Sequence, residues 1–229
     1  KLGHSRDGRK GMLQVNYGLL TDARGCPVAV SVYEGNVTDS QTLTPEIKRL
    51  RESFGIERLV MVGDRGMICQ KSIDEMRETS GIDWITALKS ASIRALVEQG
   101  QLQLGLFDER NLLELQSPQY PGERLVACRN PELAKLRAHK RQELLAATEA
   151  NLAKIKARVD AGKLAGQDEI GLRVGKLINQ YKMAKHFELA IGDNTFTFAR
   201  KLEAIAAEAA LDGIYIIRTS VSAAQMHAA

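Results

Sequence analysis

The residues with the clearest chemical potential form the segment Gly63-Asp64-Arg65-Gly66. It follows the unbroken apolar run Leu59-Val60-Met61-Val62, which is typical of a strand buried on both faces. In open α/β sheets, ligands and reacting groups gather beyond the carboxyl ends of the strands. A carboxylate fixed at such a place is an oxygen ligand for a hard cation such as Mg²⁺. Asp64 is therefore the main candidate for a catalytic or metal-binding residue.

Asp64 also has a purely structural interpretation. An aspartate in a turn can cap the helix that follows it, and Arg65 would then be its ion-pair partner. The two flanking glycines allow the backbone or a ligand to approach closely, which suits either role. The local pattern alone leaves both interpretations open.

Other chemical sites find little support in the sequence. The three cysteines, Cys26, Cys69 and Cys128, are far apart and form no C-x-x-C pair, so neither a disulfide framework nor a zinc site is expected. The histidines lack the spacing of a metal-binding pair, and no G-x-S-x-G, Walker A or dinucleotide fingerprint occurs. A phosphatase of the haloacid-dehalogenase type also places Gly-Asp at a strand end. It needs an Asp-x-Asp nucleophile on an earlier strand, which this sequence lacks.

Composition indicates a packed globular protein with a mildly basic surface. The chain has 229 residues, of which 44% are apolar and 26% charged, with a net charge of +4 and a pI near 9.0. This charge permits a polyanionic partner such as DNA without demanding one. Arg6, Arg9 and Lys10 lie in a glycine-rich segment that is either a solvated loop or a phosphate-contacting one. With no signal peptide and no apolar run near 18 residues, neither secretion nor a membrane span is expected.

Asp64 must be positioned by the elements around it, and residues 12–89 read as a mixed α/β sheet. Residues 13–20 and 28–33 are strand-like, and the connection Thr21-Asp22-Ala23-Arg24-Gly25 predicts an antiparallel hairpin. We expect this hairpin to pair in one sheet with strands at 58–63 and 82–88. Asp64 would then lie at the carboxyl edge of a central strand.

Two helices complete this part of the chain. The first should be capped by Asp39, or by Thr44 with Pro45 in the first turn, and should end at Gly55. The second should span about residues 68–79. Trp84 lies on the following strand, where buried packing is its default interpretation and stacking on a nucleotide base is the alternative.

The remainder of the chain has a different texture. Residues 90–130 are weakly patterned apart from an expected strand at 124–128. Asn130-Pro131-Glu132 predicts the start of a long helix ending near residue 161, in which Leu145, Leu152 and Val159 repeat every seven residues. A second helix over about 168–185 should pair with it as an antiparallel hairpin. Later elements are expected as strands at 186–191 and 195–199, a helix at 202–211 and a strand at 213–219.

Four short strings together resemble a known family. They are Tyr17-Gly18-Leu19-Leu20-Thr21-Asp22, Gly25-Cys26-Pro27, Glu34-Gly35-Asn36-Val37-Thr38-Asp39 and Val62-Gly63-Asp64-Arg65-Gly66-Met67. In this order and spacing they are similar to the transposase DDE domain of the insertion-sequence-four superfamily of bacterial transposases. The resemblance is good over residues 3–89. The string from Asp212 to Thr219 resembles the family's return from its insertion domain.

The resemblance implies an α/β protein with an RNase H-like mixed sheet and a largely helical (α+β) insertion domain. It places a partial catalytic core at residues 1–89, the insertion domain at 90–211 and a returning strand at 212–229. Three family carboxylates bind two divalent metals, Mg²⁺ or Mn²⁺, which promote in-line attack on phosphodiesters. The second of these carboxylates falls on Asp64. The first would precede Lys1, and the glutamate would follow Thr219.

Several further expectations follow from the resemblance. The partners are DNA, both transposon ends and target, with Arg6, Arg9, Lys10, Arg65 and Trp84 as candidate DNA-binding residues. A homodimer is compatible with the family, whereas a membrane or a small-molecule cofactor is not expected. The protein would act in the bacterial cytoplasm, at the nucleoid. Because Lys1 is not an initiator Met and the chain stops just after a strand, we expect an internal piece of a longer reading frame. The alternative function is a non-catalytic DNA-binding or dimerisation remnant.

Overall fold

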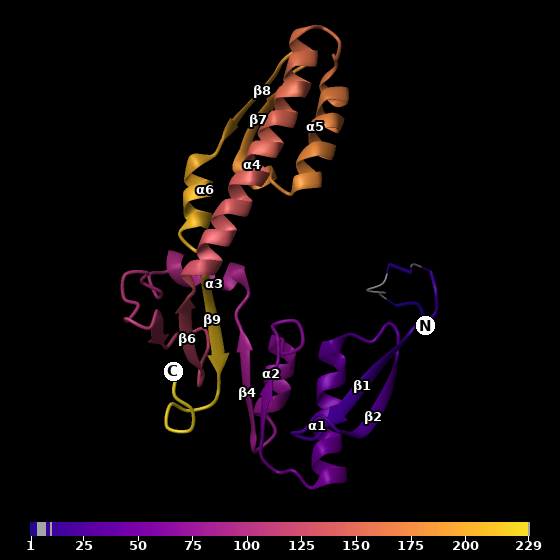
Figure 1. Cartoon of the computed structure of the whole chain (residues 1–229), viewed down its shortest axis with the longest axis vertical. Helices are drawn as coiled ribbons and strands as arrows, with labels where there is room; N and C mark the ends of the chain where they lie inside the picture. The colour runs from indigo at the N-terminus through magenta and orange to yellow at the C-terminus, as the bar shows by residue number, and fades with distance from the viewer. Residues whose placement is uncertain (4–7, 10, 229) are drawn as a thin grey trace. The chain divides into compact units, whose positions relative to one another are not determined.

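The computed structural model describes residues 1–3, 8–9 and 11–228 of the chain. It divides into two compact units (Figure 1). Unit 1 comprises Lys1–Leu106, Leu112–Ala127 and Ile216–Ala229, and unit 2 comprises Phe107–Asn111 and Cys128–Tyr215. Within the described residues, no helix is both long enough and apolar enough to cross a bilayer.

A five-stranded mixed sheet has the order β3-β4-β9-β6-β5. The strands are β3 (Leu59–Val62), β4 (Ile82–Ala87), β5 (Leu112–Leu115), β6 (Arg124–Arg129) and β9 (Ile214–Thr219). β3 and β4 run parallel, whereas β9 is antiparallel to β4. β4 and β9, which are far apart in the sequence, are thus neighbours in one sheet. The predicted mixed α/β class is confirmed.

The predicted N-terminal hairpin is formed by β1 (Val15–Thr21) and β2 (Pro27–Glu34). In its turn, Asp22 Oδ1 accepts hydrogen bonds from the amides of Arg24 (2.9 Å) and Cys26 (3.0 Å). Gly25 has a φ of +83°, the left-handed conformation that the loop requires. The sequence signals for this turn, Asp early and Gly last, therefore act as expected.

The predicted pairing of this hairpin with the strand before Asp64 is wrong. Among the described residues, β1 and β2 form a separate two-stranded sheet, and β3 is an edge strand rather than a central one. The hairpin is instead held by side chains of α1 (Asp39–Phe54). Glu46 of this helix accepts hydrogen bonds from the hydroxyls of Ser31 and Tyr33, and Arg49 Nη1 donates to Ser31 Oγ at 2.6 Å.

The start of α1 also differs from the prediction. Thr38 is the N-cap, and its amide donates to the side chain of Gln41 at 3.0 Å, so neither Asp39 nor Thr44 is the cap. Gly55 ends the helix with a φ of +66°, as expected. α2 (Gln70–Arg77) is two residues shorter at each end than predicted, and α3 (Ser90–Glu98) lies in the region that appeared weakly patterned.

Trp84 belongs to the hydrophobic core of unit 1. Its side chain packs in one cluster with residues of α1 and α2, and Trp84 is only 4% exposed. The interpretation as buried packing is therefore confirmed, and this burial counts against the expected role of Trp84 in DNA binding, which stays a prediction. A ring enclosed by the core has no face on which a base can stack.

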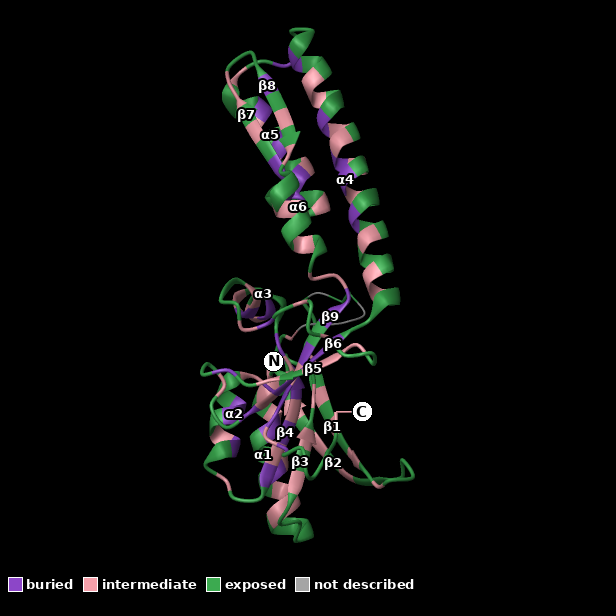
Figure 2. Cartoon of the chain, turned by 90° about the vertical axis from the view of Figure 1, so that its left-hand side faces the viewer, coloured by how far each residue is buried: buried purple, intermediate pink, exposed green. Residues whose placement is uncertain are grey.

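Unit 2 combines a helical hairpin with a small β-sheet. Its elements are α4 (Pro131–Asp160), α5 (Gln167–Tyr181), the short 3-10 helix η1 (Ala184–His186), β7 (Phe187–Ile191), β8 (Phe196–Arg200) and α6 (Leu202–Ala209). The predicted seam residues Leu145, Leu152 and Val159 are all buried in the same core as α5 and the strands. Buried positions of α4 face α5, β7 and β8 (Figure 2). The predicted helical hairpin is confirmed.

The chain enters and leaves the helical part of unit 2 at adjacent points. Asn130 caps α4, since its Oδ1 accepts from the Leu133 amide at 2.9 Å. The amide of the same asparagine donates to the carbonyl of Gly213, directly before β9, at 2.9 Å. Gly213 is required here, because a Cβ atom at this position would lie 2.2 Å from the Asn130 carbonyl oxygen.

His186 is a buried titratable residue in unit 2, with 1% exposure. Neither ring nitrogen makes a hydrogen bond in the described part of the chain, although Nε2 lies 3.3 Å from Glu208 Oε2. Burial lowers the pKa of His186 below its usual value of 6.5, against the opposing attraction of Glu208 and with the repulsion of Lys185 and Arg141.

This lowered pKa predicts an acid-sensitive contribution to stability. Below about pH 6.5 the unfolded chain binds a proton at His186 that the folded chain resists, so the free energy of unfolding falls as the pH falls toward the folded-state pKa. Urea unfolding of unit 2, followed at pH 7.5 and pH 5, should show a smaller loss of stability in His186→Phe than in the parent. The exposed residue His139 provides the control, and His139→Gln should keep the parental pH dependence. Equal pH dependence in His186→Phe and the parent would contradict the prediction.

Trp84 is the one tryptophan of the chain, so its fluorescence reports a single site. Because the indole is buried, we predict weak quenching by acrylamide and no change in emission when single-stranded DNA is added. Titration of the purified chain with an oligonucleotide measures this directly. Strong quenching by DNA would restore the stacking hypothesis.

Candidate active site

Asp64 lies in a turn directly beyond the carboxyl end of β3. Its side chain is exposed, and Oδ1 accepts hydrogen bonds from the amides of Gly66 (2.7 Å) and Met67 (2.8 Å). Its carbonyl accepts from the amide of Ile68 at 2.9 Å, and Ile68 is buried. These bonds fix the direction of the carboxylate relative to the sheet.

The glycines beside Asp64 allow side chains to approach the backbone closely. A Cβ atom on Gly66 would lie 3.1 Å from Asp64 Oδ1, and one on Gly63 would lie 3.0 Å from a side-chain atom of Ile68. A larger residue at either place would push against the carboxylate or against the buried anchor. We call residues 63–67 the Asp64 loop. It is a compact turn that presents the carboxylate of Asp64.

The structural interpretation of Asp64 as a helix cap is only partly correct. Asp64 does satisfy backbone amides of its own turn, but α2 begins at Gln70 and its N-cap is Cys69. The carboxylate therefore belongs to a turn that precedes the helix. A turn of this kind serves a functional carboxylate equally well, because it holds the group at the strand end without burying it.

Of the remaining predicted site residues, the structure describes Arg9, Arg65 and Trp84. Arg9 and Arg65 are exposed, Arg6 and Lys10 lie outside the described residues, and Trp84 is in the core. Within the described ranges, no group of three His, Cys, Asp or Glu residues is placed to hold a metal ion. The described residues thus bring no three-ligand set together and do not by themselves fit the two-metal site implied by the resemblance.

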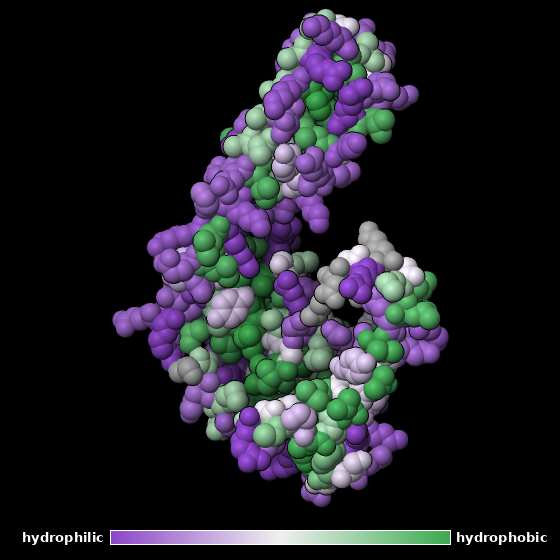
Figure 3. Space-filling model, turned by 45° about the vertical axis from the view of Figure 1, so that its right-hand side comes forward, coloured by the Kyte–Doolittle hydropathy of each residue, from purple (hydrophilic) through white to green (hydrophobic). Residues whose placement is uncertain are grey.

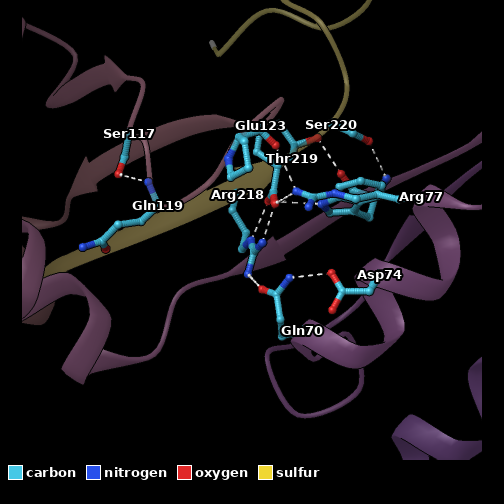
Figure 4. Close-up of polar contacts among 11 residues, drawn as sticks. Gln70, Asp74, Arg77, Ser117, Gln119, Glu123, Arg218, Thr219 and Ser220 are labelled. Carbon is cyan, nitrogen blue, oxygen red and sulfur yellow. Dashed lines mark hydrogen bonds and ion pairs between the residues drawn. The ribbon is translucent and has the colours of Figure 1, made fainter.

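A buried polar cluster in unit 1 was not anticipated from the sequence. The carboxylate of Glu123 is fully buried and accepts from Arg218 Nε (2.5 Å), Arg77 Nη2 (2.6 Å) and Trp84 Nε1 (3.3 Å) (Figure 4). Arg218 also donates to Gln70 Oε1 at 3.1 Å. We call these five residues the Glu123 cluster. Buried charges are stable only when they are paired and hydrogen-bonded, and here each charge has such partners.

The sequence held one signal for this cluster. Arg218 interrupts the apolar strand Ile214-Tyr215-Ile216-Ile217, and a charge within a buried strand requires a partner inside the protein. Nothing comparable marks Glu123, because it is the last residue of the irregular segment 116–123, directly before β6. Its partner could be found only from the fold.

Comparison with protein families matches residues 2–159 to the transposase DDE domain family. No curated protein matches the chain, and no solved structure does. The match covers the hairpin, the Asp64 loop, the sheet strands up to β6 and nearly all of α4. The mixed sheet, the position of Asp64 and this match over more than half of the chain agree, and the chain belongs to the transposase DDE domain family.

Proposed function

We propose that the chain carries part of the catalytic domain of a DDE transposase that cleaves DNA phosphodiesters and transfers strands with the help of divalent metal ions. Membership of the family supports a role in DNA transposition. The observation that carries the finer proposal is the position of Asp64, exposed in a hydrogen-bonded turn at the carboxyl end of β3 and next to the parallel strand β4. This is the sheet edge at which α/β proteins place reacting groups.

The domain organisation belongs to this proposal. Residues 1–89 and 212–229 would supply the catalytic core, and residues 90–211 would form the insertion domain. The helical unit 2 lies within that insertion, whereas β5 and β6 pair in the same sheet as β3, β4 and β9. The insertion would thus extend the core sheet as well as add a helical unit.

The proposed metal site needs carboxylates beyond the one at Asp64. Two hard cations held about 3.5–4 Å apart require several anionic oxygens to offset their charge. The resemblance places the first aspartate on a strand before Lys1 and the glutamate on a helix after Thr219. When bound, the metals would supply charge stabilisation for the attacking and leaving oxygens. Asp64 would contribute one oxygen ligand, and Arg65 a positive charge toward the DNA backbone.

The exposed edge of β3 could pair with the strand that is expected to carry the first aspartate. In the described structure β3 pairs on one side only, with β4, and Val60 and Val62 are 45% and 71% exposed. The outer face of the hairpin is apolar as well, with Val15, Tyr17, Leu19, Val28, Val30 and Val32 exposed (Figure 3). Natural edge strands are usually protected by charges, prolines or a covering element. A further strand paired with β3 would bring its side chains beside Asp64.

A second candidate function is a non-catalytic remnant that binds DNA or forms dimers. This hypothesis is favoured because the described residues bring no three metal ligands together. Under this hypothesis the chain acts through its basic surface alone. Both hypotheses place the protein at DNA in the bacterial cytoplasm, and they differ in metal-dependent cleavage.

We predict that the chain of residues 1–229 neither cleaves nor joins DNA with Mg²⁺ or Mn²⁺, because Asp64 supplies one carboxylate of the three. In the complete reading frame, Asp64→Asn should lower cleavage by a factor of about 100 or more, since even partners outside the metal's own ligands cost 10–100-fold. Nicking of supercoiled plasmid measures the activity of the 229-residue chain and that of the Asp64→Asn variant of the complete protein. Asp160→Asn, which alters a surface carboxylate paired with Lys156, is the matched control and should keep full activity.

Two results would contradict this proposal. Metal-dependent cleavage by the purified 229-residue chain would show that Asp64 does not need the expected partners. Full activity of Asp64→Asn in the complete protein would remove Asp64 from the metal site.

We also predict salt-sensitive DNA binding through Arg65 and Arg9. Each phosphate contact changes the slope of log affinity against log salt by about −0.9 on duplex DNA. Filter binding at several salt concentrations should therefore give a shallower slope for Arg65→Gln and Arg9→Gln than for the parent chain. Arg24→Gln is the control, because Arg24 is already paired with Asp22 in the hairpin turn. Affinity that does not vary with salt would rule out this electrostatic picture.

A further inference from the structure

The Glu123 cluster contacts α2 at both ends of the helix. Arg77, the last residue of the helix, donates to Glu123 and to the carbonyl of Pro121 at 3.0 Å. Gln70, the first residue, accepts from Arg218 at 3.1 Å and donates to Asp74 at 2.8 Å within the helix. Arg218 comes from β9 and Glu123 from the loop before β6 (Figure 4). α2 is thus tied to two segments that are distant in sequence.

The start of α2 is only a few residues beyond the Asp64 loop. Between them, Ile68 is buried in the same core cluster as Ile73 of α2, and its amide bonds to the carbonyl of Asp64. Ser72 of α2 is also buried and donates to the carbonyl of Met67 at 3.5 Å. A shift of α2 along or away from the sheet would therefore move the two amides that hold the Asp64 carboxylate.

We propose that Glu123 is a positioning residue for Asp64, which acts by locking α2 through Arg77 and Arg218. The inference rests on the proposed function, in which Asp64 needs a fixed direction. It assigns a role to a residue outside the Asp64 loop and outside the family's three carboxylates. Functional carboxylates must be held within fractions of an ångström, and their supporting groups provide that precision.

The chemistry of the cluster suits this role better than simple packing would. Glu123 is fully buried and meets two guanidinium groups, one of which, on Arg218, also lies over the ring of Tyr120 at 4.8 Å. The forked geometry of a guanidinium fixes angles as well as distances. If the carboxylate loses its charge, the buried guanidinium of Arg218 is left without compensation, and that of Arg77, which is 33% exposed, can turn toward water instead. The helix that carries Arg77 then loses its orientation.

Four variants of the 229-residue chain separate positioning from general stability. Glu123→Gln removes the charge and nearly keeps the shape, and Glu123→Asp keeps the charge on a shorter side chain. Glu114→Gln is the matched control, because Glu114 pairs with Arg124 on the same sheet and is 45% exposed. Gln70→Ala removes the bond to Arg218 at the start of α2, together with the bond to Asp74 within the helix, and leaves Glu123 and its other partners in place. It keeps the test available if Glu123→Gln fails to fold.

Two spectroscopic signals report directly on the cluster and on the Asp64 loop. The chain has one tryptophan, and its indole N–H donates to Glu123, so a single indole resonance follows this bond. The amide resonances of Gly66 and Met67 follow the hydrogen bonds to Asp64 Oδ1. A role limited to overall stability would leave these amide shifts unchanged in the folded protein.

In Glu123→Gln we expect the indole resonance and the Gly66 and Met67 amides to move. Loss of a buried charge partner loosens its surroundings, so amides of residues 64–77 should exchange about tenfold faster or more, while those of the β1–β2 hairpin keep their rates. Glu123→Asp should restore part of this protection. Gln70→Ala should change the Asp64 loop amides with a smaller effect on the indole, and Glu114→Gln should change neither.

Unchanged amides at Gly66 and Met67 in both Glu123→Gln and Gln70→Ala would overturn the inference. So would a uniform rise of exchange across unit 1, which indicates stability alone. Failure of the proposed function has a different signature. It appears as full cleavage by Asp64→Asn in the complete protein, whatever the exchange rates are.

Discussion

Glu123 brings a negative charge into a part of unit 1 where water cannot reach it. Such a charge is stable only among hydrogen-bond donors and opposite charges, and the surrounding chain supplies them from three places: α2, β4 and β9. These segments are therefore constrained to meet at one point. The contacts with Glu123 therefore constrain the register of β9 beside β4, the position of α2 on the sheet and the position of Trp84 in the core. Directional bonds of this kind give the sheet one arrangement where apolar packing alone would allow several.

The hairpin of unit 1 is attached by a related but weaker device. Glu46 of α1 reaches the hydroxyls of Ser31 and Tyr33 on β2, and Arg49 completes the contact. These groups are partly exposed, so their contribution to stability is modest compared with a buried bond. The hairpin keeps an apolar outer face, whereas α1 is anchored in the core by Leu43 and Ile47.

Local signals in the sequence were sufficient for many elements of the fold. The turn with Asp22 and Gly25, the strand that ends at Asp64 and the seam of Leu145, Leu152 and Val159 each depend on residues close together in the chain. Sequence reasoning failed where distant segments decide. The predicted pairing of the hairpin with β3 is wrong, because the contacts that hold the hairpin come from α1. The helix α3 was not predicted, and its N-cap residue Lys89 provides no side-chain cap. Of the candidate site, Asp64 was found because a strand end marks it, whereas Glu123 lies in an irregular loop and has no local mark.

The hydrogen bond between Asn130 and Gly213 shows where the helical unit joins the sheet. β6 ends just before one of these residues and β9 begins just after the other, and the two strands are neighbours in the sheet. In topological terms the whole helical unit is therefore a very large loop between adjacent strands. The entropic cost of closing a loop grows only slowly with its length, so an insert of this size burdens the sheet little more than a short turn would. Inserts at this junction can therefore be exchanged, lengthened or reduced to a tight turn while the strands on either side keep their pairing, which makes the junction a natural place for diversification among proteins with this sheet.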